Sequence, residues 1–499
     1  MTTDRPHLLV VVPNRITGDS RVIKTALAAS RAGYRVTLLG QARRKRLETS
    51  LDDVRVVRVP IVRTHHEAYL AAMRTVTGRR SPIAYHGPSE AAEAGARLGR
   101  HRERRLSGAR GAGRLAAEAE LLARRLVHRL RRVGAGRETV VEPDVSPDAV
   151  QWRRDWPILV DWQETFGPVI EELAPDVVHS NDAIMIGVTA EAVRRMRAAG
   201  RDVRWLYDAH EHVSAVDWGT EARSAVYRQY EAEYIHQADA VVTVSDELAV
   251  ALEQEHGLAA RPLVVRNVPI RHVDTAGTPR LRDVAGVPAD APLVVYSGYL
   301  EARRGVATLV EALPLLPSVH VALVTSADPA AGTLGEILAS ARALGVADRV
   351  HTAPYVAPYQ VPAYLASADI GIFPGLRHPS QEDSLPTKLP EYLHARLPLV
   401  VSDLRTMAEF VRRTGVGEVF TAGDPESLAE AVQKALAGQQ EARAHITDEM
   451  LDDLSWETQS RTFADLYARL AGRRPEPPAD PSPWEAVETG PDGTPVVIN

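Results

Sequence analysis

The chain has 499 residues with a formal net charge of -6, and 45% of its residues are hydrophobic. This length exceeds the size at which one hydrophobic core stops growing, so two domains are expected, while the ordinary composition excludes global disorder. The charge gives no general attraction to nucleic acid or to an anionic membrane, and the lack of cysteine excludes disulfides, thiolate catalysis and cysteine-based zinc sites.

The amino-terminal elements alternate between short apolar runs and helical patterns, which is typical of stacked βαβ units in a parallel sheet. A first strand is expected at 7–12, a helix at 20–32 before Gly33, and a second strand at 36–39. Later strands of the same sheet are expected at 177–179, 205–207 and 240–244. These segments predict a doubly wound, Rossmann-like domain over residues 1–270.

An Arg-rich insert interrupts this domain at about residues 65–157. Between Arg74 and Arg137 it contains sixteen arginines against five glutamates. Apolar residues recur along one helical face in this insert: Leu115, Ala119, Leu122, Leu126 and Leu130. Two interpretations remain open, a solvated helical hairpin whose leucines pack on the domain and a basic amphipathic helix that lies on anionic lipid. Nucleic-acid binding is the weakest interpretation because aromatic residues for base stacking are nearly absent.

A second series of apolar runs predicts a second Rossmann-like domain over residues 291–455. Its strands are expected at 293–296, 319–325, 350–352, 370–373 and 399–401. Residues 271–290, rich in Pro, Gly, Asp and Arg, are expected to form the linker. Residues 456–472 are expected to form a helix that returns to the first domain, and residues 473–499 a disordered tail. Ligands of such folds bind at the carboxyl ends of the strands, here in the cleft that both sheets face.

The segment from Asp383 to Glu391 is the most informative in the chain. It reads Asp-Ser-Leu-Pro-Thr-Lys-Leu-Pro-Glu and leads into an apolar helical pattern. A helix N-terminus offers unpaired backbone N–H groups and the positive end of a dipole, which suits a diphosphate. A carboxylate one turn inside the helix can accept hydrogen bonds from ribose hydroxyls. The segment therefore predicts a nucleotide-sugar site.

A glycine and two cations accompany this segment. Gly298 follows the strand at 293–296 and permits close approach to a phosphate, while Arg304 offers a planar, always charged fork to two phosphates. Lys388 is one of only four lysines, so a chain that otherwise uses arginine retains an ammonium beside the expected diphosphate. The alternative is structural: Gly298 forms a tight turn, and the two cations are solvated surface charges.

With these motifs the chain resembles a GT-B glycosyltransferase of glycosyltransferase family 4. The most specific match lies at 292–405 and includes the acidic pair Asp383 and Glu391, which are separated by seven residues. The resemblance implies that Glu391 holds the donor ribose and that Arg304 neutralises the phosphates. It assigns the diphosphate and the sugar to the loop between the two acids, which contains Ser384, Leu385, Pro386, Thr387 and Lys388.

Four positions depart from the family pattern. Asp383 replaces a glutamate, Tyr299 an arginine, Arg304 a lysine and Arg396 a glycine. These departures weaken the prediction of the donor sugar more than the prediction of the fold.

The first loop of the amino-terminal domain also resembles the family, on what the resemblance makes the acceptor side. Asp19 or Ser20 can cap the helix that follows, which leaves Gly18 and Arg21 near the cleft as substrate-binding residues.

A second amino-terminal motif reads Leu-Tyr-Asp-Ala-His-Glu at 206–211. It resembles the family segment whose histidine contacts the donor sugar, so His210 is expected in the site, and Asp182 is expected among the substrate-binding residues. Alternatively, His210 is a capping histidine or one satisfied within the core.

The resemblance implies an enzyme that moves a sugar from a nucleotide-diphosphate sugar to an acceptor hydroxyl with retention of configuration. We expect His210, Arg304, Lys388 and Asp383 to act in catalysis without a metal ion or other cofactor, because no Asp-x-Asp pair suited to a magnesium-held diphosphate stands out. The expected acceptor is a saccharide, a lipid-linked saccharide or a small molecule, in polysaccharide, glycolipid or natural-product glycosylation. Two alternatives remain: an inactive scaffold that binds a nucleotide or a partner, and a nucleotide-sugar epimerase.

The location of the protein is expected from two further features. The amino terminus lacks a signal-peptide core, and no run reaches the roughly 18 apolar residues that a membrane-spanning helix needs. We expect a cytoplasmic protein, at the inner face of the plasma membrane if the insert contacts lipid, with no nucleic-acid partner.

Overall fold

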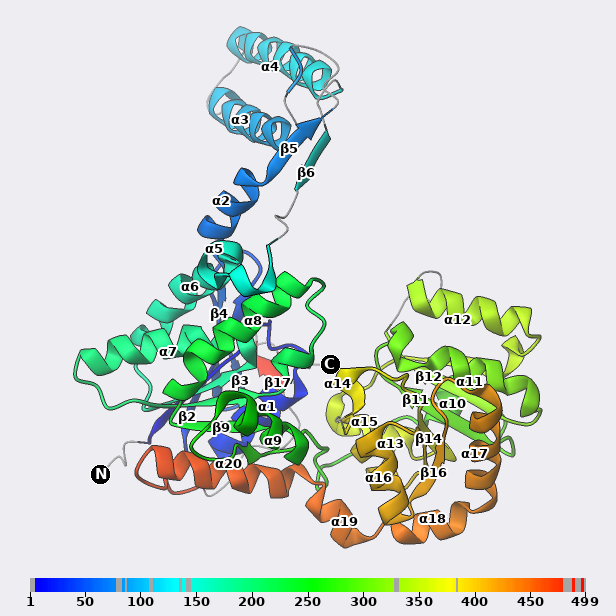
Figure 1. Cartoon of the computed structure of the whole chain (residues 1–499). Helices are drawn as coiled ribbons and strands as arrows, with labels where there is room; N and C mark the ends of the chain where they lie inside the picture. Colours follow the sequence, from blue (N-terminus) through cyan, green and yellow to red (C-terminus); the bar gives the residue numbers. More distant parts are fainter. Residues whose placement is uncertain are drawn as a thin grey trace. The chain divides into compact units, whose positions relative to one another are not determined.

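The computed structural model describes residues 5–77, 83–85, 88–106, 111–133, 137–140, 145–326, 332–382, 385–478, 487–489 and 495–497. The chain forms two compact units, one of Met1–Val62 with Trp162–Asn499 and the other of Arg63–Asp161. The second unit corresponds to the Arg-rich insert. The first unit contains two separate sheets with helices on their faces (Figure 1). The predicted pair of Rossmann-like, parallel-sheet domains is therefore confirmed.

The amino-terminal sheet has ten strands in the order β10-β9-β8-β7-β1-β2-β4-β3-β17-β18. Pairing is parallel from β10 through β4, and β3 and β17 add in antiparallel orientation. The strands are β1 (His7–Val11), β2 (Arg35–Ala42), β3 (Leu47–Leu51), β4 (Val54–Pro60), β7 (Val177–Asn181), β8 (Arg204–Ala209), β9 (Ala240–Thr243), β10 (Leu263–Val264), β17 (Val487–Thr489) and β18 (Pro495–Val497). The hairpin β3–β4 was not predicted, because one glutamate and two arginines interrupt its apolar pattern.

The helices of this half include α1, which begins where Asp19 accepts a hydrogen bond from the backbone N–H of Val22. Asp19, and not Ser20, is therefore the cap. The helices are α1 (Ser20–Arg31), α6 (Ile158–Leu173), α7 (Asp182–Ala198), α8 (Glu221–Tyr234) and α9 (Asp246–His256).

The carboxyl-terminal sheet has six parallel strands in the order β13-β12-β11-β14-β15-β16. They are β11 (Leu293–Ser297), β12 (His320–Val324), β13 (Val350–Ala353), β14 (Ile370–Phe373), β15 (Leu399–Ser402) and β16 (Gly417–Phe420). Alternate residues enter two different apolar clusters, as in β15, where Leu399 and Val401 belong to one cluster and Val400 to the other. Both faces of this sheet are therefore buried, which explains its continuous apolar strands.

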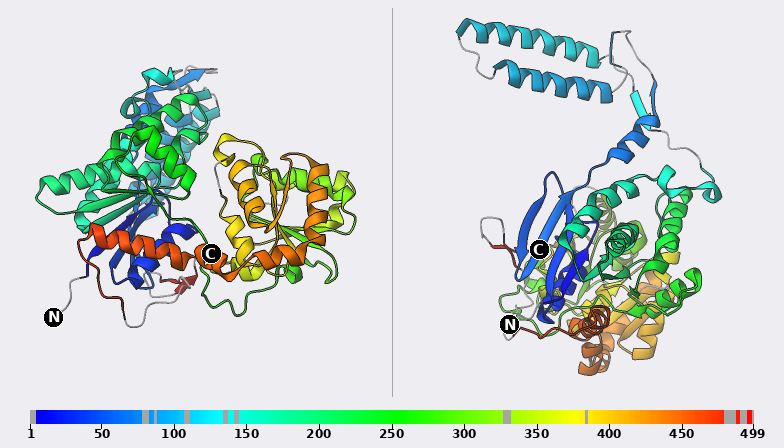
Figure 2. Two further views of the ribbon diagram at one scale, coloured as in Figure 1. Left: turned by 60° about the horizontal axis from the view of Figure 1, so that its bottom comes forward. Right: turned by 90° about the vertical axis from the view of Figure 1, so that its left-hand side faces the viewer.

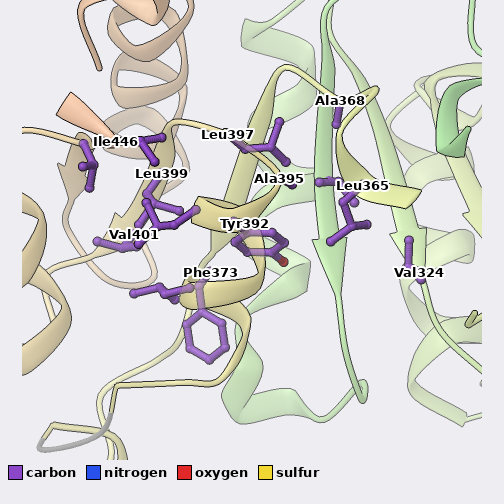
Figure 3. Close-up of a cluster of buried hydrophobic side chains, with 14 of the residues drawn as sticks. Val324, Leu365, Ala368, Phe373, Tyr392, Ala395, Leu397, Leu399, Val401 and Ile446 are labelled. Atoms are coloured by element: carbon purple, nitrogen blue, oxygen red, sulfur yellow. The ribbon is translucent and has the colours of Figure 1, made fainter. Parts of the chain in front are cut away.

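The helices of this half cover the sheet and connect its strands. They are α10 (Leu281–Ala285), α11 (Val306–Ala312), α12 (Gly332–Ala343), α13 (Val361–Leu365), α14 (Pro379–Glu382), α15 (Lys388–His394), α16 (Arg405–Thr414), α17 (Pro425–Ala437), α18 (Gln439–His445) and α19 (Asp448–Asp453). The last helix, α20 (Trp456–Leu470), belongs to the amino-terminal half. Figure 3 shows Tyr392 of α15 beside Leu365, Ala395 and Phe373 in one of the two clusters.

The segment expected as a linker, 271–290, contains α10 and contributes to the carboxyl-terminal core. Leu281 is fully buried, and Arg282 donates hydrogen bonds to the carbonyl groups of Pro288 and Ala291 and forms an ion pair with Asp369. The helix could not be predicted from the composition of this segment, because the segment has few apolar residues. The partners of its buried Arg282 include the distant Asp369, which sequence spacing does not reveal.

The end of the chain returns to the amino-terminal half. Helix α20 packs against α1, and its residues Trp456, Phe463 and Tyr467 lie in the same apolar cluster as β1 and β2. Beyond it, the expectation of a wholly disordered tail is wrong for two short strands, because β17 pairs with β3 and with β18. An edge strand such as β3 offers unpaired backbone groups, which a Val- and Thr-containing segment can satisfy.

The second unit is built around a helical hairpin. Helices α3 (Pro88–Leu106) and α4 (Gly111–Val133) lie side by side, as Figure 1 and the right-hand view of Figure 2 show. The unit also contains α2 (Thr64–Ala72), β5 (Arg74–Thr77), β6 (Arg137–Val140) and α5 (Trp152–Asp155). Within this unit the leucine stripe on α4 is not packed, since Leu122, Leu126 and Leu130 are 67%, 60% and 63% exposed. Both interpretations of the stripe, packing on the domain and contact with lipid, therefore remain predictions.

Candidate active site

A cavity of about 380 Å³ lies within the first unit and is lined by residues from both of its halves. The amino-terminal half contributes Asp19, Arg21, His210, Val244, Arg266, Asn267 and Val268, and the carboxyl-terminal half contributes Tyr296, Ser297, Gly298, Tyr299, Arg304, Phe373, Leu385, Pro386, Thr387, Lys388 and Pro390. Many of these residues follow the carboxyl ends of parallel strands, where ligands bind in doubly wound folds. This volume falls in the range of about 300–1,000 Å³ that is usual for small-molecule sites.

Helix α15 places Lys388 and Glu391 one turn apart. The Lys388 Nζ donates to Glu391 Oε2 at 3.0 Å, and both side chains keep part of their surface exposed. Glu391 lines a second cavity, and that cavity shares Thr387 and Lys388 with the first. A ligand that fills both cavities therefore meets a cation and, next to it, a carboxylate.

The position of α15 is fixed by Tyr392. Its ring packs directly on Gly371, where a Cβ atom would come within 2.3 Å of the ring, and its hydroxyl accepts a hydrogen bond from the Ser297 N–H at 2.9 Å. The hydroxyl donates to the carbonyl of Ile372. These contacts hold the helix against β11 and β14 and so fix the backbone that carries Lys388.

The first turn of α15 offers fewer backbone donors than the sequence indicated. The N–H of Leu389 is bonded to the carbonyl of Pro386, and Pro390 has no N–H. Side-chain cations must therefore supply most of the positive charge at this end of the cavity.

Gly298 brings the backbone after β11 close to Lys388. Its φ of +154° is a conformation that other residues rarely adopt, and an added Cβ would lie 3.6 Å from Lys388 Cε. Any side chain here would fill space beside the ammonium group.

Arg304 closes the same side of the cavity. It ends a short helical turn, Ala302–Arg304, and its guanidinium carbon lies 5.7 Å from the centre of the Phe373 ring. It forms no ion pair with any described acid, whereas its neighbour Arg303 pairs with Glu301 at 2.6 Å. Arg304 is thus held by an aromatic ring and keeps its charge for a ligand.

The amino-terminal side contains a buried network centred on Asp208. This carboxylate receives two hydrogen bonds from Arg21, at 2.8 and 3.0 Å, and one from His179 Nε2 at 3.1 Å. A carboxylate only accepts, so His179 Nε2 carries the proton and its Nδ1 accepts from the Tyr467 hydroxyl. Burial raises the pKa of Asp208, but the charges of Arg21 and His210 outweigh it and hold the pKa well below the usual value.

His210 lies between two carboxylates. Its Nε2 is 3.2 Å from Asp208 Oδ2, and its Nδ1 is 3.2 Å from Asp182 Oδ1. Burial alone would lower the pKa of His210, but the charges of Asp208 and Asp182, both close to the ring, raise it to about 10. The two carboxylates therefore favour the charged form of His210.

Asp182 reaches His210 from a strained position at the start of α7. Its φ is +70°, in the left-handed region that residues other than glycine rarely occupy. Strain of this kind persists where surrounding contacts enforce it and is concentrated at functional sites.

The sequence-predicted residues are distributed as follows. The first cavity brings together Arg21, His210, Gly298, Arg304, Leu385, Pro386, Thr387 and Lys388. Glu391 lines the adjoining cavity, Asp182 contacts His210, and Gly18 lies in the first loop but lines neither cavity. Asp383 and Ser384 lie outside the described residues.

Arg21 has a different place from the one expected. It is only 3% exposed, and besides Asp208 it donates to the carbonyl of Val265 at 2.8 Å. Its charge is neutralised inside the protein, so it supports the cavity wall and does not offer a free cation to a substrate.

Sequence reasoning missed several residues of the site. Asp208 stands in the quoted motif before His210, yet nothing in the pattern indicated that Arg21 pairs with it. Lys24 is also buried beside the second cavity, where its Nζ donates to Asn267 Oδ1 at 2.9 Å, and burial together with the nearby charge of Arg21 lowers its pKa to about 7.

Two searches of the described residues bear on ligands and membranes. Among these residues, no group of three or more His, Asp or Glu side chains is placed to hold a metal ion. In the same part of the chain, no helix combines the length and the apolar character needed to cross a bilayer.

Two family models match the chain. Residues 278–450 match "Glycosyl transferases group 1", and residues 109–268 match "Glycosyltransferase Family 4". Together they span about two thirds of the sequence. The second match begins inside the Arg-rich insert.

Known proteins agree with these matches. A D-inositol 3-phosphate glycosyltransferase from Xylanimonas cellulosilytica is 25% identical over 205 residues, which cover 40% of this chain and 48% of that protein, so the chain matches about half the length of this relative. A sucrose-phosphate synthase from Thermosynechococcus elongatus has 17% identity and a TM-score of 0.60, with 94% of this chain and 100% of that chain covered. Anabaena Alr3699/HepE in complex with UDP-glucose has 13% identity and a TM-score of 0.56, with 93% and 100% covered. At these identities the solved structures establish the fold.

Proposed function

We propose that this chain, a glycosyltransferase of the GT-B fold that resembles family 4, transfers a sugar from a nucleotide-diphosphate sugar to an acceptor hydroxyl. The observation that supports this most is the cavity in which Arg304, Lys388 and His210 converge, with Glu391 beside Lys388. Two neighbours of the same fold were solved with UDP-glucose and UDP-2-fluoro glucose, so uridine diphosphate sugars are the first donors to test.

The proposed donor pose follows from charge. A diphosphate placed beside Gly298 meets Arg304 and Lys388, and the ribose meets Glu391, which exchanges its bond with Lys388 for bonds to the sugar hydroxyls. As the bond between sugar and phosphate breaks, negative charge grows on the departing diphosphate. Cations fixed in advance stabilise that charge most where it develops.

The state of His210 limits the mechanism. Asp208 and Asp182 lie 3.2 Å from its two ring nitrogens and favour its charged form, and an imidazolium cannot remove the proton of the acceptor hydroxyl. We therefore assign this role to the departing phosphate, in keeping with the retention of configuration that the family resemblance implies. His210 contributes a positive charge and a hydrogen-bond donor toward the sugar. Its Nδ1 then exchanges its contact with Asp182 for one with the sugar.

The proposal requires neither a metal ion nor another cofactor. Arg304 and Lys388 supply the positive charge that a divalent ion gives in other transferases. Activity is expected to persist in the presence of a chelator. Loss of activity with chelator and its return with a divalent ion would contradict this part of the proposal.

The decisive experiment incubates the purified chain with radiolabelled uridine diphosphate sugars and a lipid and saccharide fraction from the host. Transfer of label to an acceptor supports the glycosyltransferase. Binding without turnover indicates an inactive scaffold. This alternative remains because Asp383 stands where the family usually has a glutamate. A changed sugar without acceptor indicates an epimerase. The polysaccharide, glycolipid or small molecule that becomes labelled identifies the pathway.

A further inference from the structure

The second unit has an apolar helix face that no described residue of the same unit covers. Among the described residues, five of the twelve large apolar side chains that are exposed lie on α4: Leu122, Leu126, Val127, Leu130 and Val133. Their exposed fractions range from 55% to 74%. A patch of this kind on a water-exposed helix marks a binding surface.

The opposite face of α4 accounts for the packing of the hairpin. Leu121 and Ala117 are 4% and 6% exposed, and His128 accepts or donates a hydrogen bond with the buried Tyr85 at 3.0 Å. Arg131 stacks on the same tyrosine ring, 4.3 Å from its centre. The hairpin is therefore held together without the exposed leucines, which are left available.

Arginines border the apolar face along one side. On a helix of 3.6 residues per turn, Arg125, Arg129 and Arg132 follow the edge of the stripe formed by Leu122, Leu126 and Val133. These three arginines are exposed and have no hydrogen-bond or ion-pair partner among the described residues. From Leu121 to Val133 the sequence contains no acid at all.

The acids of the helix lie in its first half and are already neutralised. Glu120 is paired with Arg105 at 2.6 Å and with Arg124 at 2.8 Å, and Glu118 with Arg114 at 3.0 Å. The second half thus presents a continuous apolar ridge about 17 Å long with unpaired positive charge beside it.

We propose that this face of α4 binds the surface of an anionic phospholipid bilayer, with the helix parallel to the membrane plane. The leucines and valines enter the boundary between headgroups and acyl chains, and Arg125, Arg129 and Arg132 contact lipid phosphates. A bilayer supplies both an apolar layer and negative charge in one surface. A second copy of the chain would bring the same arginines and repel them, and a nucleic acid would leave the apolar ridge uncovered.

The test is cosedimentation of the full chain with vesicles of phosphatidylcholine, alone or mixed with phosphatidylglycerol. We expect binding to the mixed vesicles and little to the neutral ones. The triple variant R125Q/R129Q/R132Q should bind about a hundredfold less tightly, since each arginine near an anionic surface contributes about fivefold. The double variant L126Q/L130Q should lose binding by at least about tenfold.

Matched controls separate the surface from general effects. Leu344→Gln and Arg412→Gln replace an exposed leucine and an exposed arginine of the first unit, and both should bind like the original chain. Circular dichroism should show unchanged helix content in every variant, because the replaced side chains are all exposed.

Several outcomes would overturn the proposal. Equal binding to neutral vesicles, or binding that the arginine variant does not weaken, removes the electrostatic part. If the original chain does not bind mixed vesicles, the bilayer is not the partner of this face. If the chain then sediments as an oligomer that the L126Q/L130Q variant does not form, the partner is a second copy of the chain. Because the readout is vesicle binding, failure here leaves the transferase activity untouched.

Discussion

The two sides of the cavity use charge differently. On the amino-terminal side, Arg21 and Asp208 have side chains that are 4% and 0% exposed and bond to each other. On the carboxyl-terminal side, Lys388 and Glu391 remain 26% and 18% exposed, and Arg304 has no acidic partner among the described residues. The comparison teaches that equal charges serve different ends: those that are buried and paired hold the wall in place, and those that are partly exposed are free to meet a ligand.

The largest effect should come from the buried side. Asp208→Asn removes the counter-charge of Arg21 and His210 and leaves both cations buried, which should lower the free energy of unfolding by about 3–5 kcal/mol. Denaturant unfolding measures this loss. Glu172→Gln removes an acid from a surface pair with Arg46 in the same half and should cost less than about 1 kcal/mol. Equal losses in the two variants would refute the distinction between the two sides.

The second effect tests the open side by activity. Arg304→Ala should lower kcat about 10²–10³-fold, because one fixed donor to the developing charge is lost. Its melting temperature should stay nearly unchanged, since its one aromatic contact contributes little to stability. The matched control is Arg303→Ala, whose side chain pairs with Glu301 outside the cavity and should leave kcat as it was.

The third effect is a pH dependence of the buried side. The pKa of His210 is raised from 6.5 to about 10, so its ion pairs contribute stability in full below pH 6.5 and lose that contribution as the pH rises to 10. The ring carbon and nitrogen resonances of His210 in NMR should show no titration between pH 6 and 8. An inflection near 6.5 would mean that the imidazole is neutral and free to act as a base.

The fourth effect is smaller and again concerns the open side. Glu391→Gln removes the charge that a ribose hydroxyl would meet, and uridine diphosphate should bind about tenfold less tightly by calorimetry. Glu430→Gln, which alters an exposed pair with Lys434, should bind as before. Unchanged affinity in Glu391→Gln would place the nucleoside elsewhere.

The smallest effect concerns a position outside the cavity. Arg396 has a φ of +59°, and its guanidinium bonds to the carbonyl of Ile446 and to Asp448. Arg396→Gly relieves the left-handed strain but loses these half-exposed contacts, so the free energy of unfolding should change by less than about 1 kcal/mol. A decrease of several kcal/mol in the free energy of unfolding would show that the contacts of the Arg396 side chain contribute more to stability than the backbone strain costs.

The sequence predicted the elements that depend on local pattern. Apolar runs such as 293–296 and 370–373 became β11 and β14, and the helix after Thr387 was expected from its own residues. The departure at Arg396 also had a local meaning, because the family glycine stands where the backbone turns left-handed, and the structure keeps that turn with an arginine.

The parts that escaped prediction depend on distant partners. Arg21 and Asp208 are separated by 187 residues, so no spacing indicates that they bond. The strand β17 pairs with β3, which lies more than 400 residues earlier, and Arg282 of α10 pairs with the distant Asp369. The cations of the cavity were predictable as residue types, whereas which of them are buried and which are partly exposed required the folded chain.

The last helix has a consequence for biosynthesis. Trp456 donates its indole proton to the carbonyl of Lys24, 432 residues earlier, and Tyr467 completes the bonds of His179. During translation these partners emerge from the ribosome long before α20 does, so the amino-terminal half has open polar groups until α20 has been synthesised. Completion of the amino-terminal half is thereby coupled to synthesis of α20, and a chain that stops before α20 lacks a finished first half.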